Sequence, residues 1–404
     1  MGMGTETVSA ERRTVPWLRM AIRWYKAAAI LLLNTIVLII AINLVLWLVS
    51  LARSGNLDYR DPVSTKYPEK ALQQIYAPMT DDARRQLLHE TYTRPVRYEQ
   101  YLEVTEAPYR GQYVNVSEEG YRIGPAPGPW PPDPKNYNIF VFGGSTTFGY
   151  GVADDQTIPA HLQEWLRQLS PAPGEKQRAC IYNFGRGYYY STPERILFEQ
   201  LVQKGARPDL ALFIDGINDL YYPLGWWEFK PQLQRALGRR RTRIVADVIE
   251  LVSVTPLGKA MAALRPQPAT APATTAPSDE DSTLVKQAME RYLWNKRTLE
   301  VIAAENHIRT LFVFQPASFY QYDVTYHLFK GDDWPKVRLA AEGYLRMDEY
   351  VKSHPMGDDF LWLADMQVNV QKPLYCDMLH YTPEFNKQIA DRIGTFLAKQ
   401  RVPR

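Results

Sequence analysis

Apolar side chains are distributed unevenly along the chain, and the longest uninterrupted run lies near the N-terminus. Residues 27–51 carry no charged side chain. As a helix rising about 1.5 Å per residue they would reach roughly 37 Å, enough to cross a hydrocarbon core of about 30 Å. Five basic residues lie within 15 positions before the run and three within 15 positions after it, a bias that favours a cytoplasmic N-terminus. We therefore expect a single-pass signal anchor in the cell (inner) membrane, with residues 1–26 cytoplasmic and the later residues extracytoplasmic.

From residue 137 the pattern changes to short apolar runs that alternate with helical stretches. The runs begin near residues 138, 180, 209, 310 and 360, and the helical stretches cover 158–169, 193–204, 284–306, 337–353 and 383–400. Continuous apolar runs are typical of strands buried on both faces of a parallel sheet. Their alternation with helices predicts a doubly wound α/β domain over residues 137–404, with its site at the carboxyl ends of the strands.

Two segments depart from this alternation. Residues 52–136 are polar and contain the proline-rich stretch 125–134, which cannot form a helix or a central strand. We interpret this region as a juxtamembrane stalk that packs on the main domain. The domain itself carries an insertion, 223–283, in which the Pro/Ala/Thr-rich residues 266–281 predict a disordered linker.

Composition narrows the possible partners and cofactors. Hydrophobic residues make up 46% and charged residues 23% of the chain, as in ordinary globular proteins. A formal net charge of +3 gives no support for a nucleic-acid partner. Two cysteines and no His-x-x-x-His pair give no support for a bound metal, and we expect no cofactor. Cys180 and Cys376 could pair in an oxidising compartment, or they could be two separate buried thiols.

Four short motifs carry candidate chemistry, and the first three follow apolar runs. Ser145 lies in Gly-Gly-Ser-Thr, the second motif is Asn-Phe-Gly-Arg-Gly-Tyr at 183–188, and Asn218 lies in Gly-Ile-Asn-Asp. Near the C-terminus, Asp377 and His380 are three residues apart, so the carboxylate can orient the imidazole. Together the motifs supply a nucleophile, two oxyanion donors, an orienting acid and a base.

These four motifs resemble the conserved blocks of the SGNH (GDSL-like) hydrolase family. The resemblance covers about residues 137–400 and implies a flavodoxin-like α/β/α fold that hydrolyses or transfers acyl esters. It implies Ser145 as nucleophile, His380 as general base and Asp377 as its partner. Block one reads Gly-Gly-Ser-Thr instead of Gly-Asp-Ser-Leu, as in some membrane-anchored members.

The resemblance also implies an oxyanion hole made by the N–H of Ser145, the Asn218 amide and a backbone N–H from block two. Counted from Asn183, the family's oxyanion glycine falls on Tyr188, and Gly187 stands one residue earlier. Tyrosine retains a backbone N–H that can donate. If the turn requires a positive φ, however, Gly187 is the better candidate because glycine adopts it without strain.

Aromatic residues crowd the expected mouth of the site and suggest several substrates. Candidates for substrate contact are Tyr189, Tyr221, Trp226 and Trp227. We expect an esterase acting on acyl groups, such as O-acetyl, of an extracytoplasmic carbohydrate. An O-acyltransferase to a polysaccharide and a lipid esterase are alternatives. A catalytically silent membrane scaffold with polysaccharide-assembly partners is an alternative of another class.

Overall fold

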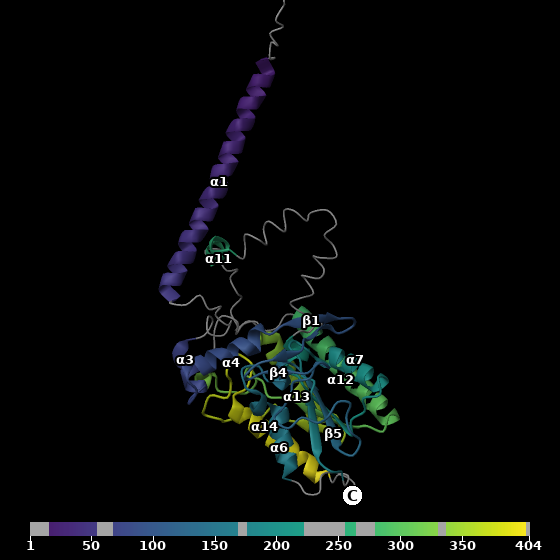
Figure 1. Ribbon diagram of the computed structural model, residues 1–404. Coiled ribbons are helices and arrows are strands. Elements are labelled where there is room, and N and C mark those ends of the chain that lie inside the picture. The colour runs from purple at the N-terminus through teal and green to yellow at the C-terminus, as the bar shows by residue number, and fades with distance from the viewer. Residues whose placement is uncertain are drawn as a thin grey trace, which may run out of the picture. The chain divides into compact units, whose positions relative to one another are not determined.

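The computed structural model describes residues 16–54, 68–168, 176–221, 255–263, 279–329 and 337–400. They belong to two compact units (Figure 1). The first unit comprises residues 1–59 and 234–269, and the second comprises residues 60–233 and 270–404. Most of the expected insertion 223–283, including residues 266–278 of its linker, lies outside the described residues.

The first unit contains the expected apolar helix. Helix α1 spans Pro16–Ser54, and its part Trp17–Val49 is long and apolar enough to cross a membrane. Asn43, a polar residue within that part, donates from Nδ2 to the Ile39 carbonyl at 2.9 Å and accepts the Leu257 N–H at 2.9 Å. Because polar groups in lipid need such internal partners, the position of Asn43 is compatible with a membrane span. The helix agrees with the single-pass anchor expected from the sequence.

The second unit is built on a five-stranded parallel sheet. Its strands are β5 (Tyr137–Gly143), β6 (Ala179–Asn183), β7 (Leu210–Asp215), β8 (Arg309–Phe314) and β9 (Phe360–Trp362). They lie in the order β6-β5-β7-β8-β9, and every neighbouring pair is parallel. This is the flavodoxin-like order, in which the chain turns to opposite sides of the first strand. The predicted doubly wound α/β/α fold is therefore confirmed.

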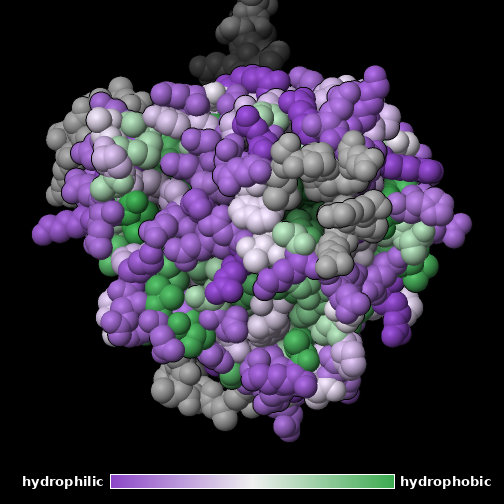
Figure 2. Space-filling view, turned by 90° about the horizontal axis from the view of Figure 1, so that it is seen from below, coloured by the Kyte–Doolittle hydropathy of each residue, from purple (hydrophilic) through white to green (hydrophobic). Residues whose placement is uncertain are grey.

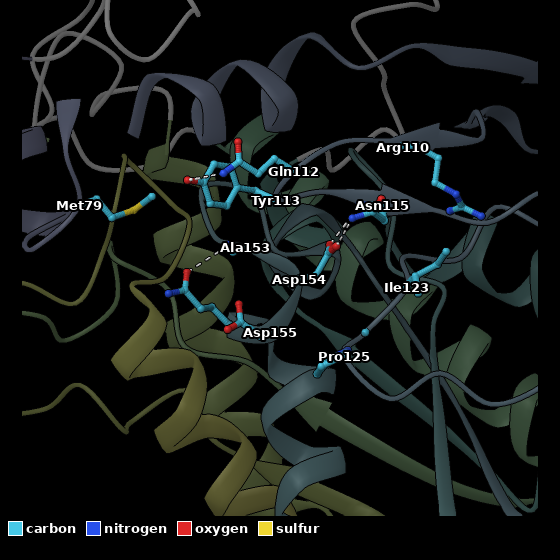
Figure 3. Close-up of a pocket in the computed structure, with 12 residues that line it drawn as sticks. Met79, Arg110, Gln112, Tyr113, Asn115, Ile123, Pro125, Ala153, Asp154 and Asp155 are labelled. Carbon is cyan, nitrogen blue, oxygen red and sulfur yellow. Dashed lines mark hydrogen bonds between the residues drawn. The ribbon is translucent and has the colours of Figure 1, made fainter. Parts of the chain in front are cut away.

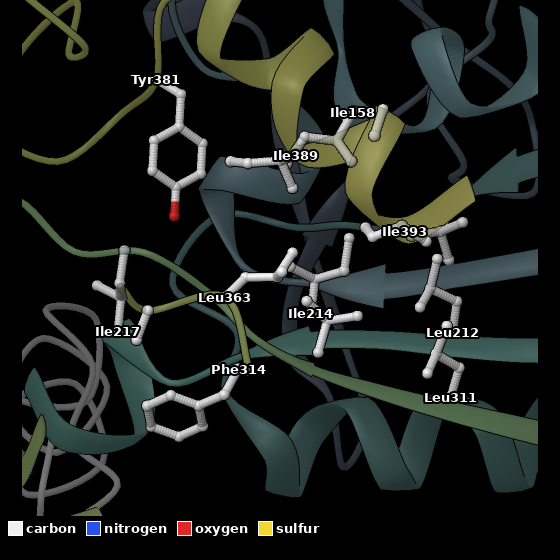
Figure 4. Packing of buried hydrophobic residues seen from close by; sticks show 14 of the residues in the cluster. Ile158, Leu212, Ile214, Ile217, Leu311, Phe314, Leu363, Tyr381, Ile389 and Ile393 are labelled. Atoms are coloured by element: carbon white, nitrogen blue, oxygen red, sulfur yellow. The ribbon is translucent and has the colours of Figure 1, made fainter. Parts of the chain in front are cut away.

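Helices cover both faces of this sheet because strand side chains alternate in direction. Ile139 and Val141 belong to the core under α6 (Ile158–Arg167) and α14 (Pro383–Lys399). Phe140, Phe142 and Phe213 belong to a more aromatic core under α7 (Ser191–Gln203) and α12 (Asp279–Glu305). Figure 4 shows the aliphatic side, where isoleucines of α6 and α14 meet leucine and isoleucine side chains of the strands.

Threonines begin the two helices of the aliphatic face. The side chain of Thr157 accepts the Ala160 N–H ahead of α6, and that of Thr382 accepts the Phe385 N–H ahead of α14. Both helices also have a proline in their first turn. N-cap threonine followed by proline is a common start signal for a helix. The remaining regular elements of the domain are α5 (Ser145–Phe148), η1 (Asp154–Gln156), α8 (Ile217–Tyr221), η3 (Val324–Tyr326) and α13 (Arg338–Ser353).

Residues 68–136 have their own secondary structure and belong to the same unit as the sheet. Glu90 accepts the backbone N–H groups of Gln112, Tyr113 and Val114, which fixes a hairpin against the helix that carries it. The elements are α3 (Glu69–Ile75), α4 (Asp81–Thr93), β1 (Val96–Glu99), β2 (Glu103–Glu106), β3 (Tyr109–Arg110) and β4 (Asn115–Val116).

The surfaces of the two units differ in character. In α1, Leu31, Leu32 and Ile40 are 69%, 64% and 61% exposed. The face of the second unit in Figure 2 is mainly hydrophilic, and its hydrophobic residues form small separate groups. A continuous exposed apolar helix is unfavourable in water, so α1 is suited to an apolar environment, whereas this face of the second unit is suited to water.

Candidate active site

Ser145 stands where strand β5 ends and the short helix α5 begins. The residue before it, Gly144, is the N-cap of that helix. A Cβ at Gly144 would lie 2.5 Å from Asn218 Nδ2 and 3.0 Å from the Tyr189 carbonyl oxygen. Only glycine leaves this space open. The first three sequence motifs therefore converge at the carboxyl ends of β5, β6 and β7, as expected for a doubly wound sheet.

Hydrogen bonds join Ser145, His380 and Asp377 into one chain. His380 Nε2 lies 2.7 Å from Ser145 Oγ, and His380 Nδ1 lies 2.5 Å from Asp377 Oδ2. The other carboxylate oxygen, Asp377 Oδ1, accepts the N–H groups of Leu379 and His380, each at 2.8 Å. The geometry is that of a nucleophile, a base and an orienting carboxylate.

The electrostatics keep Asp377 ionised. Burial of its carboxyl by itself raises the pKa, but the His380 imidazole, the Tyr92 hydroxyl and the His380 backbone N–H outweigh burial and hold the pKa well below its usual range. The side chains of His380 and Asp377 are 14% and 9% exposed. A largely buried, ionised carboxylate can stabilise the positive charge that the imidazole acquires when it takes a proton from serine.

The candidate oxyanion donors are distributed differently from the expectation. Asn218 Nδ2 donates one hydrogen to the Tyr189 carbonyl at 2.7 Å and has a second hydrogen for a substrate. Tyr188, not Gly187, has the positive φ of the block-two turn, at 65°. The Gly187 N–H lies 3.4 Å from Glu106 Oε1, and a Cβ there would lie 2.4 Å from the Tyr150 hydroxyl. The preference for Gly187 is thus corrected: this glycine makes room for Tyr150, and Tyr188 is the block-two candidate.

The aromatic residues expected to contact substrate are placed in several ways. Tyr189 is only 1% exposed, and its hydroxyl donates to the Leu102 carbonyl at 3.3 Å. Its predicted side-chain contact with substrate is therefore wrong, because the ring belongs to the core on the α7 side. Tyr221 is partly buried and packs against the aliphatic core. Trp226 and Trp227 lie outside the described residues.

Sequence reasoning missed a ring of side chains around the imidazole. The Tyr92 hydroxyl donates to Asp377 Oδ2 at 2.5 Å. The Tyr150 ring stacks on that of His380 with a centroid distance of 5.1 Å and an interplanar angle of 22°. Arg94 donates to the Tyr150 hydroxyl at 3.0 Å. None of these residues stands in a motif or directly after a sheet strand, so neither signal could identify them.

A group of three buried carboxyls was also missed. Glu194 on α7, Asp215 at the end of β7 and Asp219 on α8 are 0%, 4% and 1% exposed. Asp219 accepts the Ser191 hydroxyl at 2.6 Å and the Ser191 N–H at 3.2 Å. Asp219 directly follows Asn218 in the chain. The group of three carboxyls therefore lies next to the candidate oxyanion donor.

No His, Cys, Asp and Glu side chains among the described residues form a group of three that could hold a metal ion. The described part of the chain does contain a cavity of about 620 Å³ beside the β3–β4 hairpin and η1 (Figure 3). Asp154 lines it and accepts the Asn115 amide at 2.8 Å. Its lining includes none of the three residues Ser145, Asp377 and His380.

Comparisons with known proteins give matches only among solved structures. No family model matches the chain, and no curated protein matches it. A protein named for the G-D-S-L lipolytic family, from Desulfitobacterium hafniense DCB-2, is 12% identical; the match covers 65% of this chain and 99% of that one, with a TM-score of 0.34. A member of the lipolytic G-D-S-L family from Veillonella parvula DSM 2008 is 10% identical, with coverages of 65% and 98% and a TM-score of 0.32.

An acetyl xylan esterase is similar at the same level. It is 11% identical, the match covers 64% of this chain and 98% of that one, and the TM-score is 0.33. Two of these proteins are named for the G-D-S-L family, whose motifs the sequence resembles, and the third is named as an esterase. Because each TM-score quoted is below 0.5, we infer function from the geometry of the site itself.

Proposed function

We propose that the chain is a membrane-anchored serine esterase of the SGNH type, which hydrolyses acyl esters, in particular O-acetyl esters, on extracytoplasmic carbohydrate. One observation carries the proposal: the continuous hydrogen-bonded chain from Ser145 Oγ through His380 to Asp377 Oδ2, with distances of 2.7 and 2.5 Å. This arrangement can activate a hydroxyl for attack on a carbonyl carbon.

The proposed reaction has two steps. As Ser145 Oγ attacks the ester carbonyl, its proton moves to His380 Nε2, while Nδ1–H keeps donating to Asp377. The tetrahedral intermediate collapses to an acyl-serine, and the alcohol leaves with the proton from Nε2. Water then gives a proton to Nε2 and attacks the acyl-serine, which releases the acid and restores the serine hydroxyl.

Three donors support the negative oxygen of each tetrahedral intermediate. They are the backbone N–H groups of Ser145 and Tyr188 and the second amide hydrogen of Asn218. The contact between Asn218 and the Tyr189 carbonyl fixes the amide before substrate arrives. Donors held in place in this way stabilise developing charge without reorganising during the reaction.

The proposed location and substrate follow from the anchor. The end of α1 at Ser54 is 15 residues before Glu69, the first residue of α3, and an extended chain covers about 3.3–3.6 Å per residue. The chain would therefore attach the catalytic unit to the membrane that α1 crosses. With the N-terminus cytoplasmic, as the basic residues before α1 favour, that unit would be on the outer side, where acylated glycans and lipid esters occur.

Removal of the nucleophile tests the proposal. In the full-length chain purified in detergent, Ser145→Ala should abolish ester hydrolysis and labelling by a fluorophosphonate, because the proposed acyl-enzyme forms on the Ser145 hydroxyl. Ser353→Ala is the matched control, since Ser353 lies at the exposed end of α13 and its hydroxyl donates to the Glu349 carbonyl. Labelling that persists in Ser145→Ala would contradict the assignment of the nucleophile.

Product analysis tests the substrate. The wild-type chain should release acetate from an O-acetylated polysaccharide faster than it releases fatty acid from lipid vesicles. The opposite ratio would replace the glycan by a lipid ester. Transfer of the acetyl group to an added sugar acceptor, at the expense of free acetate, would replace hydrolysis by acyl transfer.

A further inference from the structure

The last turn of α4 contacts the triad although it lies far before the catalytic domain in the sequence. Tyr92 is separated from Asp377 by 285 residues, and its hydroxyl donates to Asp377 Oδ2 at 2.5 Å. The same oxygen accepts the imidazole Nδ1–H at 2.5 Å. Oδ2 therefore has two side-chain donors, one from the domain itself and one from the juxtamembrane segment.

The same segment also controls the face of the imidazole. The Tyr150 ring, stacked on His380, is also contacted by Arg94, whose Cζ lies 4.7 Å from the Tyr150 ring centroid. The Tyr92 ring meets the imidazole edge-on, with a centroid distance of 6.4 Å and an interplanar angle of 72°. Residues at the end of α4 thus contact the carboxylate and one ring edge directly and reach the ring face through Tyr150.

Strong polar contacts hold this end of α4 in place. Arg94 donates from Nε and Nη2 to the two oxygens of Glu106 at 2.7 and 2.8 Å, and both side chains are 2% exposed. Two positions before Tyr92, Glu90 accepts three backbone N–H groups of the β3–β4 turn. A bidentate buried ion pair fixes orientation as well as distance. Tyr92 is therefore presented to Asp377 from a rigid support.

We propose that α4 belongs to the catalytic apparatus and that Tyr92 is a positioning residue, which holds the Asp377 carboxylate in the orientation that the imidazole needs. The inference rests on the proposed serine esterase function and extends it beyond the sheet domain. The segment interpreted as a stalk thereby completes the active site.

The chemistry of the tyrosine suits this role. Burial and the neighbouring Asp377 carboxylate raise the Tyr92 pKa well above its usual value, so the phenol remains a donor throughout the working pH range. Without this donor, Oδ2 would have the imidazole alone, and Asp377 would be freer to rotate. The carboxylate would also be more basic, so the imidazole–carboxylate couple would bind a proton at higher pH.

The test compares Tyr92→Phe with Tyr98→Phe in the full-length chain. Tyr98 is a matched control because it lies in the same segment, on β1, with 67% of its surface exposed. For Tyr92→Phe we expect kcat to fall about tenfold or more, as for loss of a hydrogen bond to a charged group, while KM changes less than about twofold. The acidic limb of the pH–rate profile should move to higher pH, and Tyr98→Phe should match the wild type.

A second variant tests the hydrogen bond itself while the phenol ring stays in place. With 3-fluorotyrosine at position 92 the ring is retained and the phenol is a stronger donor, so the acidic limb should move to lower pH. The other titratable groups around the couple are Tyr76 and Cys376 near Tyr92, Tyr150 on the imidazole and Arg94 in contact with Tyr150. They are unchanged in both variants, so opposite shifts would report on position 92 alone.

The outcomes separate this inference from the proposed function. A wild-type chain that neither hydrolyses esters nor reacts with fluorophosphonate would overturn the esterase assignment. An active wild type whose kcat and pH profile are unchanged by both substitutions at position 92 would overturn the positioning role and leave the esterase intact. A parallel fall in kcat and melting temperature, with no movement of the acidic limb in either variant, would also overturn it, because Tyr92 would then be structural.

Discussion

Two kinds of buried carboxyl lie near the carboxyl ends of the strands and differ in the hydrogen-bond donors around them. One is Asp377, and the other is the set formed by Glu194, Asp215 and Asp219. Asp377 accepts four hydrogen bonds, from the Tyr92 hydroxyl, the imidazole Nδ1–H and the N–H groups of Leu379 and His380. In the other set, neither carboxyl oxygen of Glu194 has a hydrogen-bond partner among the described residues. A buried carboxyl without donors is favoured in its neutral form.

The difference determines charge. The pKa of Asp377 lies well below its ordinary range, whereas burial, followed by the charges of Asp215 and Asp219, raises that of Glu194 well above it. Burial and Asp219 likewise raise the pKa of Asp215. Burial alone therefore does not decide whether a carboxyl in this fold is ionised. Asp377 stays charged because the His380 imidazole, the Tyr92 hydroxyl and the His380 backbone N–H together outweigh its burial.

The largest expected effect on kcat comes from removing the charge of Asp377. Asp377→Asn retains the shape but removes the charge, and its amide N–H cannot accept the imidazole Nδ1–H. We expect kcat to fall by about 10⁴ because the imidazole then adopts the wrong tautomer for accepting the serine proton. The measurement is the steady-state hydrolysis of an acetyl ester by the full-length chain.

The corresponding substitution in the other set provides the control. Glu194→Gln replaces a carboxyl whose neutral form is favoured by burial and by the charges of Asp215 and Asp219, so kcat should stay within about threefold of the wild type. A loss of activity in Glu194→Gln as large as that in Asp377→Asn would mean that the two sets do not differ in charge, and would contradict the comparison.

A smaller effect concerns the dependence of stability on pH. A carboxyl whose folded pKa is raised contributes stability that is present below its unfolded pKa of about 4 and is lost as the pH rises toward the folded value. Asp377 acts in the opposite direction, because its contribution is lost as the pH falls below about 4. Glu194→Gln should therefore lessen the fall in melting temperature between pH 5 and pH 8, by about 2–4 °C for each kcal/mol removed.

Glu199→Gln is the matched control for this measurement. Glu199 lies on the same helix, α7, but it is partly exposed and pairs with Arg195 at the surface. Its replacement should leave the slope of melting temperature against pH unchanged. If Glu194→Gln also left the slope unchanged, the Glu194 carboxyl would be ionised in the folded chain.

Much of the fold, and several residues that meet at the candidate site, could be predicted from local signals. Apolar runs identified all five strands of the sheet, and the motifs after them pointed to Ser145 and Asn218 as candidates. The block-two turn was harder, because Tyr188 has a positive φ that tyrosine rarely adopts. Tyr92 could not be identified, since its contact with Asp377 joins residues 285 positions apart and belongs to no pattern.

The acidic trio formed by Glu194, Asp215 and Asp219 could not be predicted from the sequence, for a related reason. Asp219 ends the third block and Asp215 stands just before it, but Glu194 belongs to a helix whose amphipathic pattern gives a glutamate no reason to be buried. Its burial depends on how α7 packs on the sheet. A property that arises from packing between distant elements leaves no trace in composition or spacing.

The smallest expected effect concerns Cys376, the neighbour of Asp377 in the chain. The sequence left a pairing with Cys180 open, but both cysteines are free and buried in the structure. Burial, followed by the Asp377 charge, raises the pKa of the Cys376 thiol. Burial raises the pKa of both side chains, but their net shifts are opposite. The imidazole and the hydrogen-bond donors lower the pKa of the carboxylate, while the Asp377 charge disfavours a thiolate beside it.

The two thiols should therefore react with a disulfide reagent such as Ellman's reagent only after denaturation, when both become titratable. A reductant should change the melting temperature by less than about 1 °C, since no disulfide constrains the unfolded chain. Rapid reaction of one thiol in the native protein would show that the region around Asp377 opens to solvent. In that case the four donors would not hold the carboxylate continuously, and the contrast with the acidic trio would be weaker than the static distances imply.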